Sequence, residues 1–571
     1  MGLVNILSRL YIAMKADTDT SKMKRHIIEN NIYGVDIEKG AVDIARLRFW
    51  LAMIVEEKEP MPLPNLHFKI MQGNSLLESV NSIDLSDLTR TNVDRSLLDS
   101  TDTERKNLKT ALSQYYNTSN HADRDRLFNE IINNVRRQIY AKDPNIDQIG
   151  LDPSANDKFF LWHTWFADVF DKGGFDIVIG NPPYIDSETM TNLGLEWERE
   201  YITQHYSYIS GNWDIYMAFL ELATNLSNKI VCYITPDKWL SKPFGKLFRE
   251  KCMTKRLSKI VHAGSDVFEN ATVDAIITLF IESSSDVIAY VFNSNKYFEQ
   301  RGHAIWKAIE SPYYIDSLFS PFCGLVSQIE SCANAKLSDF ANCEGACATS
   351  DAYKLVPLVS DLTDGAGNYY KLVNTGTLDK FANKWGNRPI KYLGVSSINP
   401  IVLTTEFESA FGKSYINKSR GPKIIIKGLN LLDAYVDENG EYLPGKSTLV
   451  INSYNVNDLH LLSAFLNSDV TIFFIKTKYS SSSYCGGITF TKEMINNFPI
   501  PSISEEIKNR LIALSKKAHS ERSLSYDANI DNEILRINII IYHLYNLKYD
   551  EVLIINPATN ITREEYENFE Y

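Results

Sequence analysis

FDIVIGNPPY, residues 175–184, joins a short apolar run to two consecutive prolines. The run FDIVIG predicts a buried β-strand, because apolar and β-branched residues favour the interior of a sheet. Two prolines cannot continue a central strand, since proline has no backbone N–H to donate, so the chain must leave the sheet at the carboxyl end of this strand. Ligands of open α/β sheets bind at that end. The stretch therefore predicts an α/β sheet with a site at residues 181–184.

Further strands are predicted on both sides of this stretch, at residues 31–37, 66–71, 229–235, 259–263 and 274–281. Apolar residues at helical spacing predict helices at residues 3–16, 41–54, 213–226 and 243–253. Strands that alternate with helices favour a parallel sheet. The first half of the chain is therefore expected to form an α/β domain.

Two regions depart from this alternation. Residues 84–150 are rich in Asp, Arg, Asn, Lys and Gln and predict a helical insertion. Beyond residue 300, strands are predicted at 422–426 and 447–451, helices at 457–467 and 503–549, and a polar loop at 479–487. We expect a boundary near residues 300–335, between a first domain at 1–325 and a second, mixed α/β domain at 330–571.

The composition excludes several classes of protein. The 571 residues are 44% hydrophobic and 23% charged, which argues against disorder, a collagen-like fibre or a small disulfide scaffold. The net charge of −12 means that any basic footprint for a nucleic acid must be local. Seven cysteines, an odd number, suit a reducing compartment. No apolar stretch is long enough for a membrane helix, and residues 1–16 lack a signal-peptide cleavage site. We expect a cytoplasmic protein with no membrane partner.

Residues 181–184 carry the groups that an exocyclic amine needs. Asn181 offers a side-chain amide, the prolines offer backbone carbonyls, and Tyr184 offers an aromatic ring. Such a set can accept both protons of an amine attached to a flat ring, and this makes the lone pair of the nitrogen more available for attack. The alternative is a proline-rich turn in which Asn181 caps a helix.

Asn181-Pro182-Pro183-Tyr184 after its strand resembles the catalytic motif of adenine-N6 DNA methyltransferases that use S-adenosylmethionine. Residues 211–216 with Phe219, residues 233–236 with Trp239 and Leu240, and residues 266–268 resemble later motifs of that family. Residues 422–427 and 466–501 resemble the C-terminal target-recognition domain of type IIG restriction–modification enzymes. The resemblance implies a Rossmann-like methyltransferase sheet followed by a mixed α/β specificity domain, with double-stranded DNA as substrate.

The resemblance also implies roles for individual residues. Asn181 and the Pro182 carbonyl, in the turn completed by Pro183, would bind the adenine amine. Tyr184 and Phe268 would stack on a base flipped out of the duplex, although Phe268 by itself reads equally as a core residue.

Cofactor contacts are implied at the ends of the two preceding strands. Asp36, followed by Ile37, matches the acid that binds the ribose hydroxyls of S-adenosylmethionine; without the resemblance, Asp36 reads as a helix cap. Asn74, followed by Ser75, stands where the family often has Asp beside the cofactor adenine. An Asn there can still hydrogen-bond an adenine edge as both donor and acceptor.

One part of the family pattern is missing. A Gly-rich cofactor loop should precede Asp36, yet the only glycine before Tyr33 is Gly2. Residues 3–16 resemble the helix that follows this loop. We therefore expect a sheet that is incomplete at its N-terminus, with an open slot between the strand ending at Asp36 and the strand ending at Gly180. We also expect poor binding of S-adenosylmethionine by the chain alone and an N-terminal partner chain that supplies the loop.

A basic run predicts contacts with DNA phosphates. Five cations and no acid lie between residues 411 and 430, namely Lys413, Lys418, Arg420, Lys423 and Lys427. The alternative is a solvated charged face. No metal site is predicted, because the cysteines at 323, 332, 343 and 347 lack the paired short spacings of zinc ligands.

Two other functions remain open. The chain is alternatively a catalytically inactive DNA-recognition fragment, or a subunit that needs a partner, because the cofactor loop is missing. It is also alternatively a protein glutamine methyltransferase, since the same motif binds a planar amide. The long region after residue 330 argues against the latter, because such enzymes need no large recognition domain.

Overall fold

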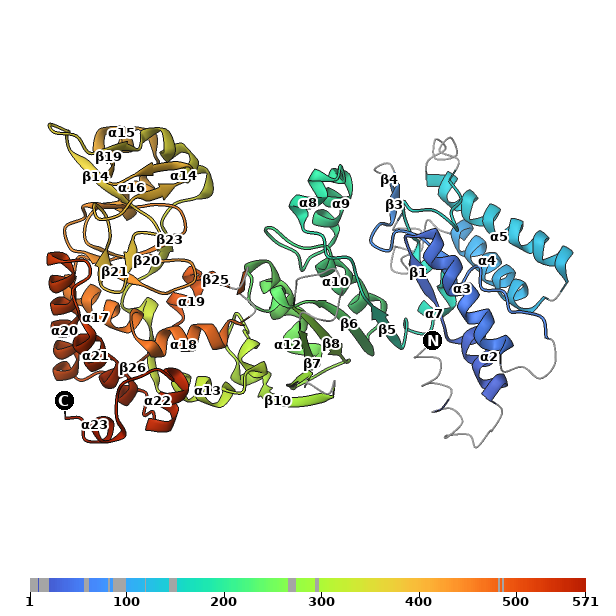
Figure 1. The fold of residues 1–571 in the computed structure, drawn as a ribbon. Coiled ribbons are helices and arrows are strands. Elements are labelled where there is room, and N and C mark those ends of the chain that lie inside the picture. The colour runs from blue at the N-terminus through green and yellow to red at the C-terminus, as the bar shows by residue number, and fades with distance from the viewer. Residues whose placement is uncertain are drawn as a thin grey trace. The chain divides into compact units, whose positions relative to one another are not determined.

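The computed structural model describes residues 9, 20–55, 61–80, 83–85, 99–118, 120–142, 151–264, 274–292, 297–480, 483–484 and 487–570. The chain is a mixed α/β protein with several separate sheets (Figure 1). Its contacts define two units. Unit 1 comprises residues 1–235 and 278–283, and unit 2 comprises residues 236–277 and 284–571. The domain boundary predicted near residues 325–330 remains a prediction.

Unit 1 begins with a small parallel pair of strands. Strand β1 (Gly34–Asp36) pairs with β2 (Ile70–Gln72), and helix α3 (Lys39–Ile54) connects them. Helix α2 (Thr20–Asn30) precedes β1 and contacts α3. One face of α3 packs with α2 and β2 into a core that contains Ile27, Ile28, Val42, Met53, Leu66 and Ile70. The hairpin β3 (Ser79–Val80) and β4 (Ile83–Asp84) follows β2.

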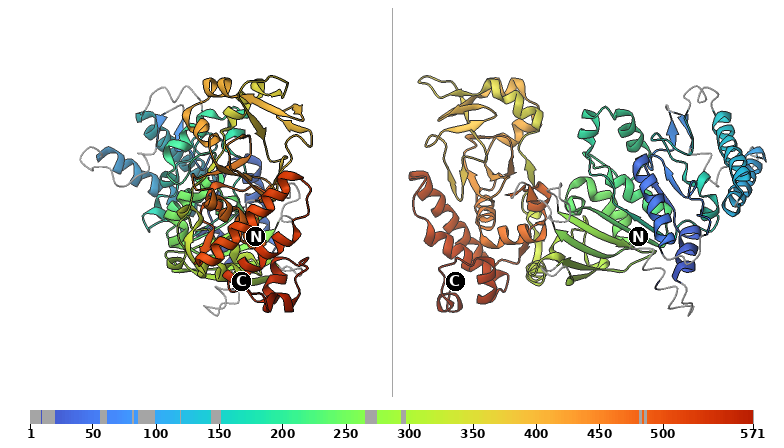
Figure 2. Two further views of the ribbon diagram at one scale, coloured as in Figure 1. Left: turned by 90° about the vertical axis from the view of Figure 1, so that its left-hand side faces the viewer. Right: turned by 45° about the vertical axis from the view of Figure 1, so that its right-hand side comes forward.

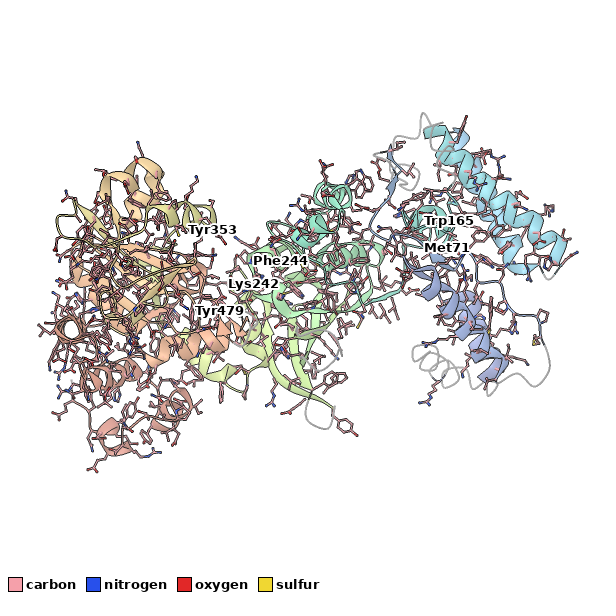
Figure 3. All side chains as sticks on the ribbon, turned by 45° about the horizontal axis from the view of Figure 1, so that its top comes forward. Met71, Trp165, Lys242, Phe244, Tyr353 and Tyr479 are labelled. Carbon is pink, nitrogen blue, oxygen red and sulfur yellow. The ribbon has the colours of Figure 1, made fainter. Side chains whose placement is uncertain are left out.

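Two helices lie in the region where the helical insertion is predicted. Helices α4 (Asp99–Asn117) and α5 (His121–Lys142) lie side by side in Figures 1 and 2. An aromatic cluster fixes them to the residues just before β2, because the ring of Phe68 stacks on Phe128 of α5 and contacts Tyr115 of α4. Trp165, labelled in Figure 3 on helix α6 (Trp162–Trp165), stacks on Phe68 with 5.6 Å between ring centroids. These ring contacts pack α4 and α5 against the rest of unit 1.

The second parallel pair of unit 1 carries the predicted site. Strand β5 (Ile177–Gly180) pairs in parallel with β6 (Ile230–Pro236), with Gly180 opposite Tyr233. Helices α8 (Ser187–Asn192), α9 (Glu196–His205) and α10 (Tyr216–Leu226) lie between them in the chain. The hydrogen-bonded order of this sheet is β10-β9-β7-β8-β6-β5, so β5 is an edge strand.

The remaining strands of that order are β7 (Leu257–Gly264), β8 (Ala275–Phe280), β9 (Asp286–Phe292) and β10 (Phe298–Ile305). Strands β7 and β9 are parallel, and β9 and β10 are antiparallel. Strands β1 and β2 form a separate sheet. In the described part of the chain no strand joins β1 to β5, and the open slot expected between those two strands remains a prediction.

The second half of unit 2 contains two four-stranded sheets. One has the order β12-β23-β20-β21, built from Cys343–Gly345, Thr448–Asn452, Lys423–Lys427 and Ala434–Asp437. The other has the order β13-β19-β14-β22, built from Ser360–Asp361, Pro400–Leu403, Tyr369–Val373 and Tyr442–Pro444. Helices α17 (Val456–Leu466), α18 (Asp469–Lys478), α20 (Glu505–Leu524) and α21 (Asp531–Leu544) bury a large apolar core with the first sheet.

Most predicted elements are confirmed in type and place. The 66–71 strand is a turn over 67–69 before β2, and the 479–487 loop contains the short pair β24 (Ser483–Tyr484) and β25 (Gly487–Ile488). The helix predicted at 243–253 is a run of short 3₁₀, α and π turns, and the helix predicted at 503–549 is divided into α20 and α21. The helix predicted at 3–16 lies outside the described residues apart from residue 9. No single described helix is long and apolar enough to cross a membrane; the pair α17 and α18, bent by 63°, passes that test only when taken together.

Candidate functional site

Residues 181–184 leave β5 at its carboxyl end, as predicted. Gly180, the last residue of β5, has no room for a side chain, because a Cβ there would lie 2.5 Å from the ring of Tyr233 on the neighbouring strand. Tyr233 is itself buried. The close approach of these two strands therefore sets where Asn181 begins.

The polar groups of this turn are linked to each other. The Tyr184 hydroxyl donates to Asn181 Oδ1 at 3.1 Å; Asn181 is exposed and Tyr184 is partly buried. The Tyr184 ring meets the buried Tyr216 ring edge to face, with 6.2 Å between centroids. Burial, with the nearby Asp214 carboxylate, raises the pKa of Tyr184, so the phenol stays neutral and keeps its proton to donate. The turn thus presents an amide and an aromatic ring with defined orientation.

Residues 212–214, which resemble a later family motif, hydrogen-bond the chain that follows Tyr184. Asp214 Oδ1 accepts from the backbone N–H of Ile185 at 3.1 Å, and the backbone N–H of Ser187 donates to the Trp213 carbonyl at 2.8 Å. The Ser187 hydroxyl donates to Asn212 Oδ1 at 2.7 Å. Residues 212–214 therefore position the chain that follows Tyr184.

The predicted cofactor residues lie together at the carboxyl ends of β1 and β2. The backbone N–H of Gly73 donates to the Asp36 carbonyl at 2.9 Å, which places Asn74 next to Asp36. The exposed Asp36 carboxylate accepts the Glu38 N–H through Oδ1 at 2.8 Å, which closes a local turn before α3, and Oδ2 makes no hydrogen bond to the described residues. The N-cap residue of α3 is Glu38, and no side chain caps this helix. Asn74 Oδ1 accepts from Leu76 N–H at 3.2 Å.

The rest of that predicted set lies beside these two residues. Ile37 is 46% exposed, and its carbonyl accepts from Gln72 Nε2 at 3.0 Å. The Ser75 carbonyl accepts from Trp162 Nε1 at 3.0 Å. In the described residues, no hydrogen bond or ring contact joins Asp36 or Asn74 to residues 181–184. Phe268 lies outside the described residues, so its stacking on a flipped base remains a prediction.

The basic run is largely neutralised by acids from elsewhere in the chain. Lys423 is fully buried, and its Nζ lies 2.6 Å from Asp437 Oδ2 and 2.9 Å from the Ser419 carbonyl. The prediction that Lys423 contacts DNA is therefore wrong, because a buried cation that is paired with a buried carboxylate is inaccessible to a phosphate.

The other four cations differ in their surroundings. Lys418 pairs with Glu344 at 3.0 Å, Lys427 pairs with Asp433 at 3.1 Å, and Arg420 pairs with Glu408. Lys413, at the start of α16 (Lys413–Ser419), is exposed and makes no ion pair with the described residues. Lys413 is thus the cation of this run that fits its predicted role best.

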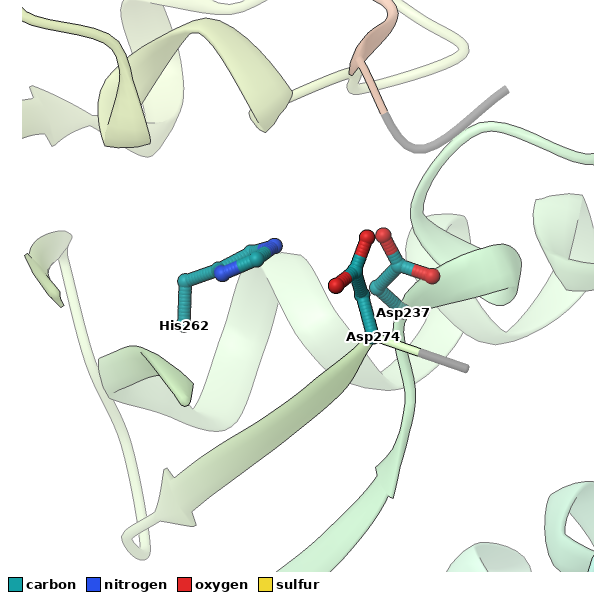
Figure 4. A group of neighbouring side chains, drawn as sticks. All are labelled: Asp237, His262 and Asp274. Atoms are coloured by element: carbon teal, nitrogen blue, oxygen red, sulfur yellow. The ribbon is translucent and has the colours of Figure 1, made fainter. Parts of the chain in front are cut away.

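A cluster in unit 2 was missed by the sequence analysis. Asp237, His262 and Asp274 bring one ligand-capable atom each within 4.8 Å of one another (Figure 4). The backbone N–H of Asp237 also donates to the Asp274 carbonyl at 3.1 Å. Burial, together with the carboxylates of Asp316 and Asp274, raises the pKa of Asp237 to about 8. Burial lowers the pKa of His262, with Asp274 opposing that shift.

This donor set of two carboxylates and an imidazole is one that a divalent cation accepts. A proton on Asp237 at neutral pH relieves the repulsion between the two carboxylates just as well as a cation would. The three residues are far apart in the sequence, and their pattern carries no metal-binding spacing that a sequence search could find.

One segment in the first half of the chain matches the model of a known family. Residues 30–268, which include both the Asp36 strand end and residues 181–184, match the family described as Eco57I restriction-modification methylase.

Individual relatives are named as restriction enzymes and methyltransferases. A putative type II restriction enzyme and methyltransferase of Methanocaldococcus jannaschii is 28% identical over 355 residues, which cover 51% of this chain and 29% of the relative. The Escherichia coli type II restriction enzyme and methyltransferase RM.Eco57I is 26% identical over 149 residues, covering 25% of this chain and 14% of the relative. The chain spans less than a third of the length of either relative.

Solved structures are less similar. The type IIL restriction–modification enzyme MmeI in complex with DNA aligns with a TM-score of 0.43 and 12% identity, covering 71% of this chain and 58% of that one. The type IIG restriction endonuclease BpuSI aligns with a TM-score of 0.25 and 13% identity, covering 68% and 55%.

Proposed function

We propose that the chain is the methyltransferase and target-recognition part of a restriction–modification enzyme. In this proposal it transfers a methyl group from S-adenosylmethionine to N6 of an adenine at a specific site in duplex DNA. The observation that carries the proposal is the turn at residues 181–184, which presents an amide and a ring at the carboxyl end of β5 inside the segment that matches the methylase family. A Rossmann-like arrangement of the strands is part of the same proposal.

The turn provides the contacts that methylation of an amine requires. Asn181 Oδ1 and the Pro182 carbonyl accept the two protons of the adenine amine, and the nitrogen lone pair becomes free to attack. The Tyr184 hydroxyl now occupies Asn181 Oδ1, so the incoming amine replaces that hydrogen bond while the Tyr184 ring stacks on the base. In the transfer an N–C bond forms, the methyl–sulfur bond breaks, and the nitrogen loses one proton to solvent.

The strand ends of β1 and β2 supply part of a cofactor site. Asp36 Oδ2 is available to accept ribose hydroxyls, and Asn74 keeps its side-chain N–H donors for an adenine edge. S-adenosylmethionine, when bound there, supplies the electrophilic methyl group. Localisation in the cytoplasm belongs to the proposal, because substrate DNA and cofactor are both found there.

The test is a methylation assay with Asn181→Ala. Duplex DNA is incubated with S-adenosylmethionine and the chain complemented by a segment that supplies the cofactor loop, and N6-methyladenine is measured by mass spectrometry of the nucleosides. We expect the substitution to lower methylation by about 100-fold or more, as removal of a key polar contact does at active sites, while duplex binding stays within about twofold. Asn192→Ala, an exposed position at the end of α8, is the matched control and should leave both unchanged.

Two outcomes would contradict the proposal. Equal loss of DNA binding or of folding in Asn181→Ala would show that residues 181–184 are a structural turn. Methylation of a glutamine-containing protein in place of DNA by the unsubstituted chain would assign the motif to the other substrate.

A further inference from the structure

We propose that Asp237, His262 and Asp274 form a binding site for one divalent transition-metal ion, with Zn²⁺ as the ion that fits best. All three residues belong to unit 2. Binding of the ion needs neither DNA nor a methyl donor, so the site is tested without them.

Three neighbouring strands bring the donors to one place. Asp237 directly follows β6, His262 lies on β7 and Asp274 directly precedes β8. Strand β8 lies between β6 and β7 in the sheet. The backbone N–H of Asp237 donates to the Asp274 carbonyl at 3.1 Å, which holds these two residues side by side. An ion bound by all three side chains would therefore link three segments that are separate in the sequence.

The donor atoms are near enough to share one ion. One oxygen of each carboxylate and one ring nitrogen of His262 lie within 4.8 Å of one another, and Figure 4 shows the imidazole facing the two carboxylates. Oxygen and nitrogen donors bind Zn²⁺ at about 2.0–2.2 Å, so donors around one ion stand roughly 3–3.5 Å apart. Small rotations of the three side chains bring their donor atoms to that spacing.

Asp237 is a buried carboxylate without a compensating charge beside it. The residue is only 6% exposed. Within the described residues, its carboxylate accepts no hydrogen bond from another residue and forms no ion pair. Buried charges in proteins are paired with an opposite charge or coordinate a metal ion, because an isolated buried charge is costly. The Asp237 carboxylate faces the other two donors, and a cation bound there would provide the missing charge.

The other two donors are also available. In the part of the chain that the structure describes, neither the ring nitrogens of His262 nor the Asp274 carboxylate makes a hydrogen bond. The His262 ring packs on Phe319, with 5.3 Å between centroids, and this contact leaves its nitrogens unused. Imidazole nitrogen and carboxylate oxygen are both common ligands of Zn²⁺.

The charges around the cluster favour a cation. The Asp316 carboxylate is a third negative charge that acts on Asp237. The buried Arg249 donates to three backbone carbonyls, and Lys238 is exposed. Residues 265–273, which connect β7 to β8, contain no Lys, Arg or His. The cluster therefore lies in a negative environment that attracts a cation.

The mixture of donors selects the kind of ion. Imidazole suits Zn²⁺ and other late transition metals, and Zn²⁺ accepts carboxylate oxygen as well. Ca²⁺ and Mg²⁺ prefer shells made of oxygen alone. Three protein donors are the number found in zinc sites that keep one position for water or another ligand. Zn²⁺ therefore fits this set better than Mg²⁺ or Ca²⁺ does.

A proton is the competing occupant. A proton on Asp237 would also relieve the repulsion between Asp237 and Asp274, but it leaves the nitrogens of His262 without a role. In the chain freed of metal this proton takes the place of the ion, and binding of Zn²⁺ releases it. Stoichiometric binding of Zn²⁺ that depends on His262 distinguishes the two occupants.

The first measurement is calorimetric titration of the full chain with Zn²⁺, after dialysis against EDTA and removal of the chelator. We expect one ion per chain with a Kd of about 10 µM or lower. His262→Ala, at a half-buried position, is expected to weaken binding at least about tenfold. Asp274→Asn, which keeps the size of the side chain, is a second variant with the same expected loss should His262→Ala not fold.

His303→Ala is the matched control. His303 lies on the same sheet with Nε2 2.8 Å from Asp286 Oδ2, but this pair belongs to no group of three donors among the described residues. We expect His303→Ala to bind Zn²⁺ as the unsubstituted chain does. Equal loss in His303→Ala and His262→Ala would show non-specific binding to histidines and would overturn the proposal.

The second measurement separates this site from the free cysteines, which also bind Zn²⁺. The chain is loaded with Co²⁺, and its near-ultraviolet absorption is recorded. We expect no thiolate-to-cobalt charge-transfer band, because all three donors are oxygen or nitrogen. Such a band would assign the ion to cysteines. Failure of Zn²⁺ to bind would leave a proton on Asp237, and unchanged affinity in both His262→Ala and Asp274→Asn would place the ion elsewhere; each of these results overturns the proposal.

Discussion

The surroundings of Lys423 decide whether its charge is accessible to other molecules. Its ammonium is enclosed in unit 2 with Asp437, and burial lowers the pKa of Lys423 while Asp437 opposes that shift. A buried ion pair is weak evidence for net stability, but removal of one partner leaves an uncompensated buried charge.

Lys423→Ala is therefore expected to destabilise the chain by about 3–5 kcal/mol, the cost typical of a broken buried pair. Urea unfolding measures the change. Lys413→Ala, which removes an exposed cation ten positions earlier, should shift the free energy of unfolding by no more than about 0.5 kcal/mol. A mild effect of Lys423→Ala together with weaker DNA binding would restore the original prediction for Lys423.

Asp237 makes stability depend on pH. Its pKa is about 8 in the folded chain and near 3.8 when unfolded, so the folded state binds the extra proton between those values. The protonation of Asp237 makes its whole contribution to the free energy of unfolding below pH 4, and this contribution is lost as the pH rises toward 8. His262 has the opposite sign, because its pKa is lowered on folding and its contribution to stability is lost below its unfolded pKa.

We expect Asp237→Asn to be more stable than the unsubstituted chain at pH 8, with the advantage shrinking toward pH 5. Thermal unfolding at both pH values measures this difference, and the variant comparison leaves His262 in place in both proteins. Asp364→Asn, in an exposed turn, should show no such trend. An advantage of Asp237→Asn that is the same at pH 5 and pH 8 would mean that Asp237 does not titrate in this range.

At the level of elements, the contact between β5 and β6 determines where the candidate site begins. Gly180→Ala would press a methyl group against the buried Tyr233 ring, which has little room to move. We expect a loss of stability of about 1–3 kcal/mol, typical of overpacking, and a lower methylation rate because Asn181 shifts with the strand end.

Gly40→Ala is the comparison for Gly180→Ala. In α3 an added Cβ at residue 40 meets no atom within 4 Å, and alanine in place of glycine favours a helix by about 0.5–1 kcal/mol. Denaturant unfolding and the methylation assay are run on both variants. If Gly180→Ala proved as stable and active as Gly40→Ala, the close strand approach would have no part in positioning Asn181.

At the level of the whole molecule, DNA binding is expected to depend on few exposed cations. The net charge of −12 repels a polyanion over most of the surface, so each phosphate contact counts. Lys413→Ala is expected to weaken duplex binding and to lower the slope of log K against log salt by about one unit, the value for one phosphate contact. Fluorescence anisotropy at several salt concentrations measures the slope, with Lys391→Ala, an exposed lysine of β17 (Ile390–Tyr392), as the control. An unchanged slope would leave Lys413 as a solvated surface residue.

The sequence by itself determined the strand before residues 181–184, its exit at two prolines, and the helical insertion. Each of these follows from local chemistry: apolar periodicity, a missing N–H, and polar helices. The acid at the end of β1 was also readable, because it directly follows a short apolar run.

Only the tertiary structure decided which charges are free. Lys423 stands opposite Asp437 because β20 and β21 pair in antiparallel register, and a local count of acids cannot see a partner across a sheet. Asp237, His262 and Asp274 meet because the fold brings three places in the sheet together: Asp237 directly follows β6, His262 lies on β7, and Asp274 directly precedes β8. Charge pairing depends on distances in the folded chain, and the order of residues along the chain does not contain those distances.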